Sequence, residues 1–186
     1  MSLFDKFRDS RTLPSIELAA KKLDASARTT GLNNSSFPGM DQEQLEEITY
    51  LAYMTRVAIV MHWLRLIIRD PSYKDRAKKI HGEFERLTFS ELPASARASL
   101  VAYIQRLIPL TLQLRSFLED KTLSKNEIVQ GMLKWPREWL STLYEDETRL
   151  KRLSLIYGMD LIKYINESTA HLGKEVETCM WGGTVQ

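Results

Sequence analysis

The hydrophobic and polar positions of this chain recur with a helical period, and the longest such segment lies between Asp41 and Asp70. Asp41 followed by Gln44 is typical of a helix start, and Pro71 disfavours helical geometry in the residue before it. The segment contains neither Gly nor Pro, and apolar side chains occupy most of its helical circumference. Such a helix is normally buried by neighbours on several sides. We therefore predict a long, mostly buried central helix at about residues 41–70.

Shorter segments with helical spacing precede and follow this central helix. Pro109 falls inside one of them and is expected to kink it, whereas Trp135 and Pro136 are expected to separate two short helices. The expected helices lie at about 14–30, 71–87, 93–118, 124–133, 136–144 and 150–172, the last extending to a point between 172 and 180. No strand-type alternation of useful length occurs. The predicted fold class is all-α, a single-domain bundle of six to seven helices around the central one.

The ends of the chain differ from its middle. We expect residues 1–12 to be a loosely held N-terminal segment, 13–180 to form the helical domain, and 181–186 to form a C-terminal tail. Residues 31–40, rich in Gly, Asn, Ser and Pro, are predicted to be a loop.

Composition and charge narrow the class of protein. With 186 residues, 44% hydrophobic and 27% charged, the chain suits one globular domain. The longest unbroken apolar run of the central segment, Val57 to Met61, is far shorter than the roughly 20 residues that span a bilayer. A net charge of +2 argues for neither nucleic acid nor anionic lipid. The single Cys179, and the lack of an apolar signal segment in residues 1–30, predict a soluble cytoplasmic protein without a transmembrane segment.

Motifs for a metal, a cofactor or a catalytic nucleophile are absent. A di-iron helical bundle needs Glu-x-x-His turns, and no His of this chain has a Glu three residues before it. Glu167 and His171 form one i, i+4 pair, which supplies two ligands at most. The chain has no glycine-rich phosphate loop and no G-x-S-x-G motif. We predict no metal, no cofactor and no catalytic residue, and an enzyme without a recognisable motif stays as an alternative.

Residues 124–147 carry another alternative, a nucleic-acid-binding regulator. The two short helices expected there, joined near Trp135 and Pro136, have the spacing of a helix-turn-helix. Arg137 would begin the recognition helix, but several acidic residues follow it, beginning with Glu138. These carboxylates would face the phosphates of a groove, which disfavours this interpretation.

Two charged residues fall on apolar helix faces. Arg56 lies close to the line that contains Ile59, and Asp160 lies between Tyr157 and Tyr164. A buried charge costs several kcal/mol unless it is paired or hydrogen-bonded. We therefore predict that Arg56 and Asp160 are buried and satisfied, and they are candidates for a pair. The alternatives are an arginine whose head reaches solvent, or a polar pocket for an anionic or peptide ligand.

Tryptophan suggests where a partner could bind. Trp135 and Trp139 are one turn apart around Pro136, and Trp181 precedes two glycines that could let it reach the same region. Aromatic residues and Arg are enriched in interface cores, so Trp135, Arg137, Trp139 and Trp181 form the predicted partner surface. The alternative is that the indoles fill the core. The predicted function, reached mainly by elimination, is a non-enzymatic protein–protein interaction module: an adaptor, chaperone, inhibitor or assembly subunit that binds another protein or itself.

Overall fold

The computed structural model describes residues 13–32, 37–90, 93–142 and 144–182. These ranges contain six helices and no strand, which confirms the predicted all-α class. The helices are α1 (Ile16–Arg28), α2 (Gln42–Ile68), α3 (Lys74–Phe89), α4 (Ala94–Glu119), α5 (Lys125–Leu140) and α6 (Glu147–Trp181). The predicted N-terminal segment 1–12 lies outside the described residues, as do residues 183–186 of the predicted tail. Trp181, which was expected to begin that tail, is instead the last residue of α6.

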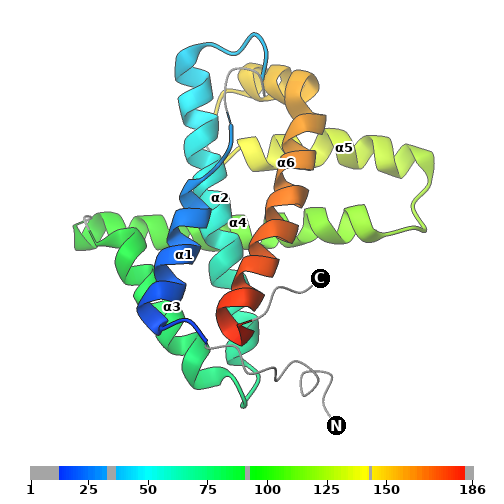
Figure 1. The fold of residues 1–186 in the computed structure, drawn as a ribbon. Coiled ribbons are helices and arrows are strands. Elements are labelled where there is room, and N and C mark those ends of the chain that lie inside the picture. Colours follow the sequence, from blue (N-terminus) through cyan, green and yellow to red (C-terminus); the bar gives the residue numbers. More distant parts are fainter. Residues whose placement is uncertain (1–12, 33–36, 91–92, 143, 183–186) are drawn as a thin grey trace.

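The long helix α2 lies at the centre of the fold, where α1, α3, α4 and α6 all pack against it (Figure 1). Its start is capped by Asp41, whose Oδ1 accepts a hydrogen bond from the Gln44 backbone N–H across 2.8 Å. Every side chain from Met54 to Met61 is buried, so this stretch has neighbours on all sides. The predicted buried central helix is confirmed.

By length and apolar composition α2 could also cross a membrane, and it is the one helix in the described ranges that passes this test. Within the fold, 67% of its most apolar stretch is buried. The core helix of a folded bundle has the same properties, so this feature alone does not indicate a membrane protein.

Two prolines lie inside helices, and each of these helices continues through its proline. Helix α4 passes through Pro109, as predicted. Helix α5 passes through Pro136, so the predicted break into two short helices is wrong. The start of α5 was foreseen correctly, because Ser124 and Glu127 form a capping box in which the Ser124 N–H donates to Glu127 Oε2 across 2.8 Å. Without a turn near Trp135, residues 124–147 do not have the helix-turn-helix arrangement that was considered as an alternative.

The start of α3 also differs from the prediction. Asp70 accepts a hydrogen bond from the Ser72 N–H at its side chain (2.9 Å) and one from the Tyr73 N–H at its carbonyl (3.2 Å). Asp70 therefore closes a tight turn, and the helix begins at Lys74 instead of Pro71.

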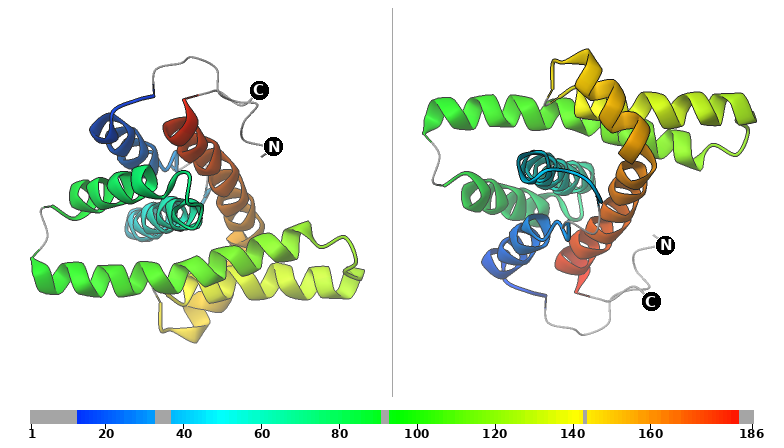
Figure 2. Two further views of the ribbon diagram at one scale, coloured as in Figure 1. Left: turned by 90° about the horizontal axis from the view of Figure 1, so that it is seen from below. Right: turned by 90° about the horizontal axis from the view of Figure 1, so that it is seen from above.

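Helices α4 and α5 form a hairpin whose far end extends away from the rest of the molecule (Figures 1 and 2). The rings of Phe117 and Trp135 pack between the two helices with centroids 6.4 Å apart. A β-carbon at Gly131 would come within 2.2 Å of the Phe117 ring, so only glycine permits this close approach. Helix α6 crosses α5 and then runs beside α1 and α2 (Figure 1).

Candidate functional site

Trp139 belongs to the core, so its predicted place on a partner surface is wrong. Its side chain is only 2% exposed, and the indole Nε1 donates a hydrogen bond to Thr55 Oγ1 of α2 across 2.9 Å. Thr55 in turn donates to the Leu51 carbonyl, which leaves its oxygen lone pairs for the indole. The alternative interpretation, that this indole fills the core, is the correct one.

The other predicted partner residues lie in two separate places. Trp181 packs edge-on against Tyr73, with ring centroids 5.6 Å apart. It lies 23 residues after Gly158, an α6 residue that packs against α5, which is about 35 Å along a helix. Trp135 is half-buried and Arg137 is exposed and pairs with Glu147; both remain on α5. The structure therefore does not bring Trp181 to the region of Trp135.

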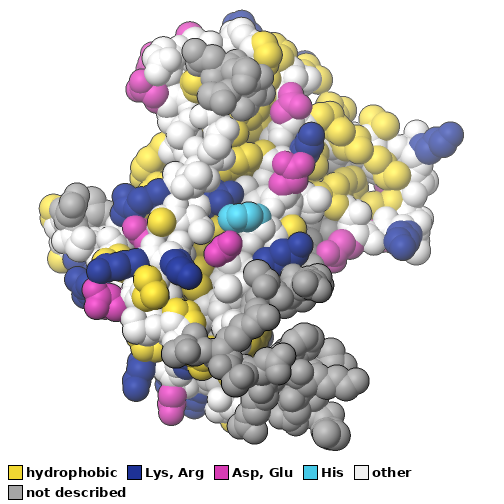
Figure 3. All heavy atoms as spheres, in the orientation of Figure 1, with side chains coloured by type: hydrophobic (Ala, Val, Ile, Leu, Met, Phe, Trp, Pro, Cys, Tyr) yellow, Lys and Arg dark blue, Asp and Glu magenta, His cyan; other side chains and the backbone are white. Residues whose placement is uncertain are grey.

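Exposed apolar side chains instead gather where α5 and α6 cross. We define the α5–α6 surface by five side chains that are 47–59% exposed: Val129, Leu133, Leu155, Ile156 and Met159. Figure 3 shows hydrophobic side chains gathered over these two helices. Single exposed apolar residues are ordinary on monomers, whereas a contiguous group indicates an interaction site.

Sequence reasoning missed this surface because α6 has apolar residues on two faces. The series that contains Leu153, Tyr157 and Leu161 is buried in the core. Leu155 and Ile156 depart from that series, and this second apolar face was the available signal.

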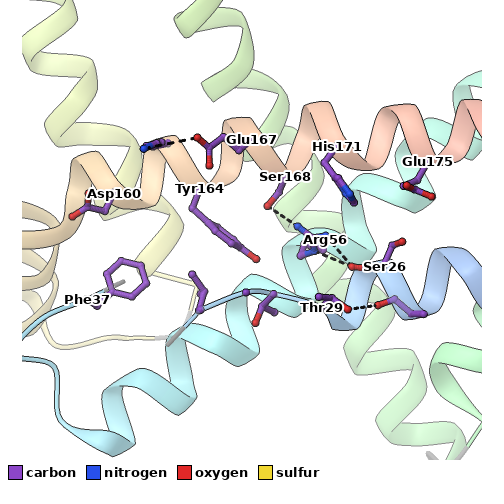
Figure 4. Close-up of a pocket in the computed structure, with 15 residues that line it drawn as sticks. Ser26, Thr29, Phe37, Arg56, Asp160, Tyr164, Glu167, Ser168, His171 and Glu175 are labelled. Carbon is purple, nitrogen blue, oxygen red and sulfur yellow. Dashed lines mark hydrogen bonds and ion pairs between the residues drawn. The ribbon is translucent and has the colours of Figure 1, made fainter. Parts of the chain in front are cut away.

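A pocket of about 730 Å³ lies between α1 and α6, with Arg56 of α2 at its base (Figure 4). Arg56 is only 6% exposed, and it is satisfied as predicted. Its Nε and Nη2 groups donate to the Ser26 carbonyl across 3.3 Å and 2.8 Å, and Nη1 donates to Ser168 Oγ across 2.9 Å. Arg56 thus joins α1, α2 and α6 at one point.

The predicted burial of Asp160 is wrong. Its side chain is exposed at the end of the same pocket, and within the described ranges it forms no ion pair with Arg56. Arg56 meets α6 at Ser168, which lies eight residues further along the helix, about 12 Å away. This distance is too great for a direct pair, so a carbonyl and a hydroxyl satisfy the arginine instead.

Tyr164 points from α6 toward Arg56 in this pocket (Figure 4). Its hydroxyl is buried and lies close to Arg56 and Ser168, but it forms no hydrogen bond of good geometry among the described residues. Burial raises the pKa of the Tyr164 hydroxyl, and the positive charge of Arg56 offsets part of that rise. The pocket therefore holds a buried cation and a neutral phenol that is available as a donor.

No group of three or more His, Cys, Asp or Glu side chains that could hold a metal ion occurs in the described part of the chain. Comparison of this sequence and fold with protein-family models, with curated proteins and with solved structures finds no match. The two features that indicate a function are therefore the α5–α6 surface and the pocket.

Proposed function

We propose that this all-α protein is a non-enzymatic protein–protein interaction module whose binding face is the α5–α6 surface. The observation that carries the proposal is the exposure of five large apolar side chains at one helix crossing. Burying such side chains against a partner contributes roughly 25 cal/mol for each Å² removed from water. Adaptors, chaperones, inhibitors and assembly subunits all work through a face of this kind.

The chemistry of the surface favours one kind of partner, an amphipathic helix with acidic flanks. Ile156 and Met159 lie four and seven residues after Arg152, so the three share one face of α6. Lys163 follows Met159 by four residues on the same face. The apolar stretch of α6 thus has a basic residue at each end, and these would pair with carboxylates that flank an apolar helix.

The experiment begins with partner capture at a defined position. A photo-crosslinking amino acid is placed at Ile156, or at Leu18, a control position on α1 that is 48% exposed. The partner should crosslink at Ile156 and not at Leu18. A concentration-dependent dimer that crosslinks only at Ile156 would make a second copy the occupant and overturn the assignment to another protein's helix.

Affinity measurements with the captured partner then test the face itself. Ile156→Ser combined with Met159→Ser should weaken binding by about 2 kcal/mol or more and leave the melting temperature almost unchanged, because both side chains are already exposed. The control Leu18→Ser should bind as the unmodified protein does. Equal affinities for all three proteins would contradict the proposal.

A further inference from the structure

The pocket is lined by hydrogen-bond donors from two helices, Arg56 of α2 and Tyr164 of α6. A guanidinium has five N–H groups, and Arg56 uses three of them on Ser26 and Ser168. One N–H on each terminal nitrogen remains after these three bonds, and a guanidinium N–H can donate to a carboxylate oxygen. The Tyr164 hydroxyl is buried and points toward Arg56, so its O–H can donate to the same ligand (Figure 4).

The charge of Arg56 is not neutralised by the protein. No carboxylate of the described residues lies within 4.0 Å of its guanidinium, because its acceptors are a carbonyl and a hydroxyl. A buried cation costs free energy unless an opposite charge compensates for it. An anionic group bound beside Arg56 would supply that charge.

The rest of the pocket limits how much negative charge it can take. Asp160, Glu167 and Glu175 also line it, together with His171 and with Lys163, which pairs with Glu167 at 4.0 Å. A doubly charged phosphate would face these three acids, with Arg56 to hold it and Lys163 already paired with Glu167. A single carboxylate is better matched, and the acids at the ends of the pocket favour a positive group elsewhere on the ligand.

We propose that this pocket binds the C-terminal carboxylate of a peptide that carries a basic side chain three or four residues upstream. The carboxylate is held by Arg56 and Tyr164, and the basic group lies beside Asp160 or Glu175. Leu32 and Phe37 form an apolar wall of the pocket. This wall lies against the peptide side chains between the carboxylate and the basic group. This activity is separate from the proposed role of the α5–α6 surface, whose five apolar side chains do not line the pocket.

The spacing within α6 sets the expected length of the peptide. Ser168 marks the position of Arg56, and Asp160 and Glu175 lie eight and seven residues away along the helix. These separations correspond to about 12 Å and 10 Å of axial distance. An extended peptide covers about 3.3–3.6 Å per residue, so three to four residues bridge the gap. A volume of 730 Å³ accommodates a ligand of this size.

Isothermal titration with the acetylated tetrapeptide KAAF tests the proposal on the full chain. The free acid should bind at least roughly tenfold more tightly than the C-terminal amide, because the amide loses a charge-assisted contact with Arg56. Tyr164→Phe removes a buried hydroxyl that forms no hydrogen bond of good geometry in the described structure. It should weaken binding of the free acid several-fold and change the melting temperature little.

Two further variants separate the ends of the ligand. Arg56→Lys keeps the positive charge but loses the planar guanidinium, so the preference for the free acid over the amide should become smaller. If Arg56→Lys does not fold, Tyr164→Phe is the variant that tests the carboxylate end. The double variant Asp160→Asn with Glu175→Gln should bind acetylated KAAF more weakly and bind acetylated AAAF with unchanged affinity. Equal affinities for acid and amide, unaltered binding by Tyr164→Phe, or tighter binding of inorganic phosphate would overturn the proposal.

Discussion

Gly158 of α6 lies against Pro136 of α5: a β-carbon on Gly158 would come within 3.2 Å of Pro136 Cγ and 3.5 Å of the Met132 carbonyl oxygen. Because Pro136 has no N–H, that carbonyl lacks its usual helical donor. The missing side chain of Gly158 lets α6 approach α5 closely at this irregular point. This crossing also positions the two helices that form the α5–α6 surface.

Replacing this glycine should therefore destabilise the fold. We expect Gly158→Ala to lower the free energy of unfolding by about 1–3 kcal/mol, because the added methyl group overpacks the crossing. The matched control is Gly82→Ala on α3, where a β-carbon would meet nothing within 4 Å. That change should stabilise the protein by about 0.5–1 kcal/mol through helix propensity. Urea denaturation of both variants checks the prediction, and a stable Gly158→Ala protein would contradict it.

Truncation of the two tryptophans of α5 should have unequal effects. Trp139→Ala should cost about 3–5 kcal/mol of stability, since it opens a cavity and leaves Thr55 without its donor. Trp135→Ala should cost less, because that indole is only half-buried. Thermal and urea melts of the two variants measure the difference, and similar losses would show that Trp139 is not the stronger anchor.

Arg56 and Asp160 should behave as independent positions. Arg56→Met removes the N–H groups that donate to the Ser26 carbonyl and to Ser168 Oγ. It should lower the free energy of unfolding by about 1–3 kcal/mol. Adding Asp160→Leu should not restore that loss, because the exposed carboxylate does not depend on the arginine. A double-mutant cycle should give a coupling energy within about 0.5 kcal/mol of zero. A clear recovery of stability in the double variant would instead support a direct pair between Arg56 and Asp160.

Protonation of His81 should make the stability of the protein depend on pH. Burial lowers the pKa of His81 below its ordinary value of 6.5, with Arg65 adding to this and Glu85 opposing it. The unfolded chain therefore binds this proton at higher pH than the native protein does. The free energy of unfolding should fall as the pH drops below about 6.5, and His81→Leu should reduce that slope. Urea melts at pH 7.5 and 5.5 measure it, with the exposed His171→Gln as control; an unchanged slope in His81→Leu would be contrary evidence.

Cys179 should be inert in the native protein. Its thiol is 1% exposed, and burial raises its pKa to about 11, so very little reactive thiolate forms at neutral pH. Alkylation by iodoacetamide at pH 7.5 should be slow in buffer and fast in denaturing urea. Mass spectrometry over time distinguishes the two, and rapid labelling of the folded protein would show that the thiol is accessible.

The sequence by itself determined the helical class and the central helix. These depend on local facts: the 3.6-residue recurrence of apolar positions, the cap at Asp41 and the capping box at Ser124 act within a few residues. Each of these features needs no knowledge of distant neighbours.

Only the tertiary structure decided which apolar faces find a partner within the chain. Pro136 breaks a helix by local rules, yet α5 continues through it, and Gly158 of α6 packs against it. Trp139 and Trp181 have the same chemistry, but one is hydrogen-bonded in the core and the other packs at the far end of α6. Asp160 follows the same local rule as Arg56 and still lies at the surface, because burial depends on what packs against a position in space. Helical periodicity identifies a face, and only the docking of distant helices determines whether that face is covered.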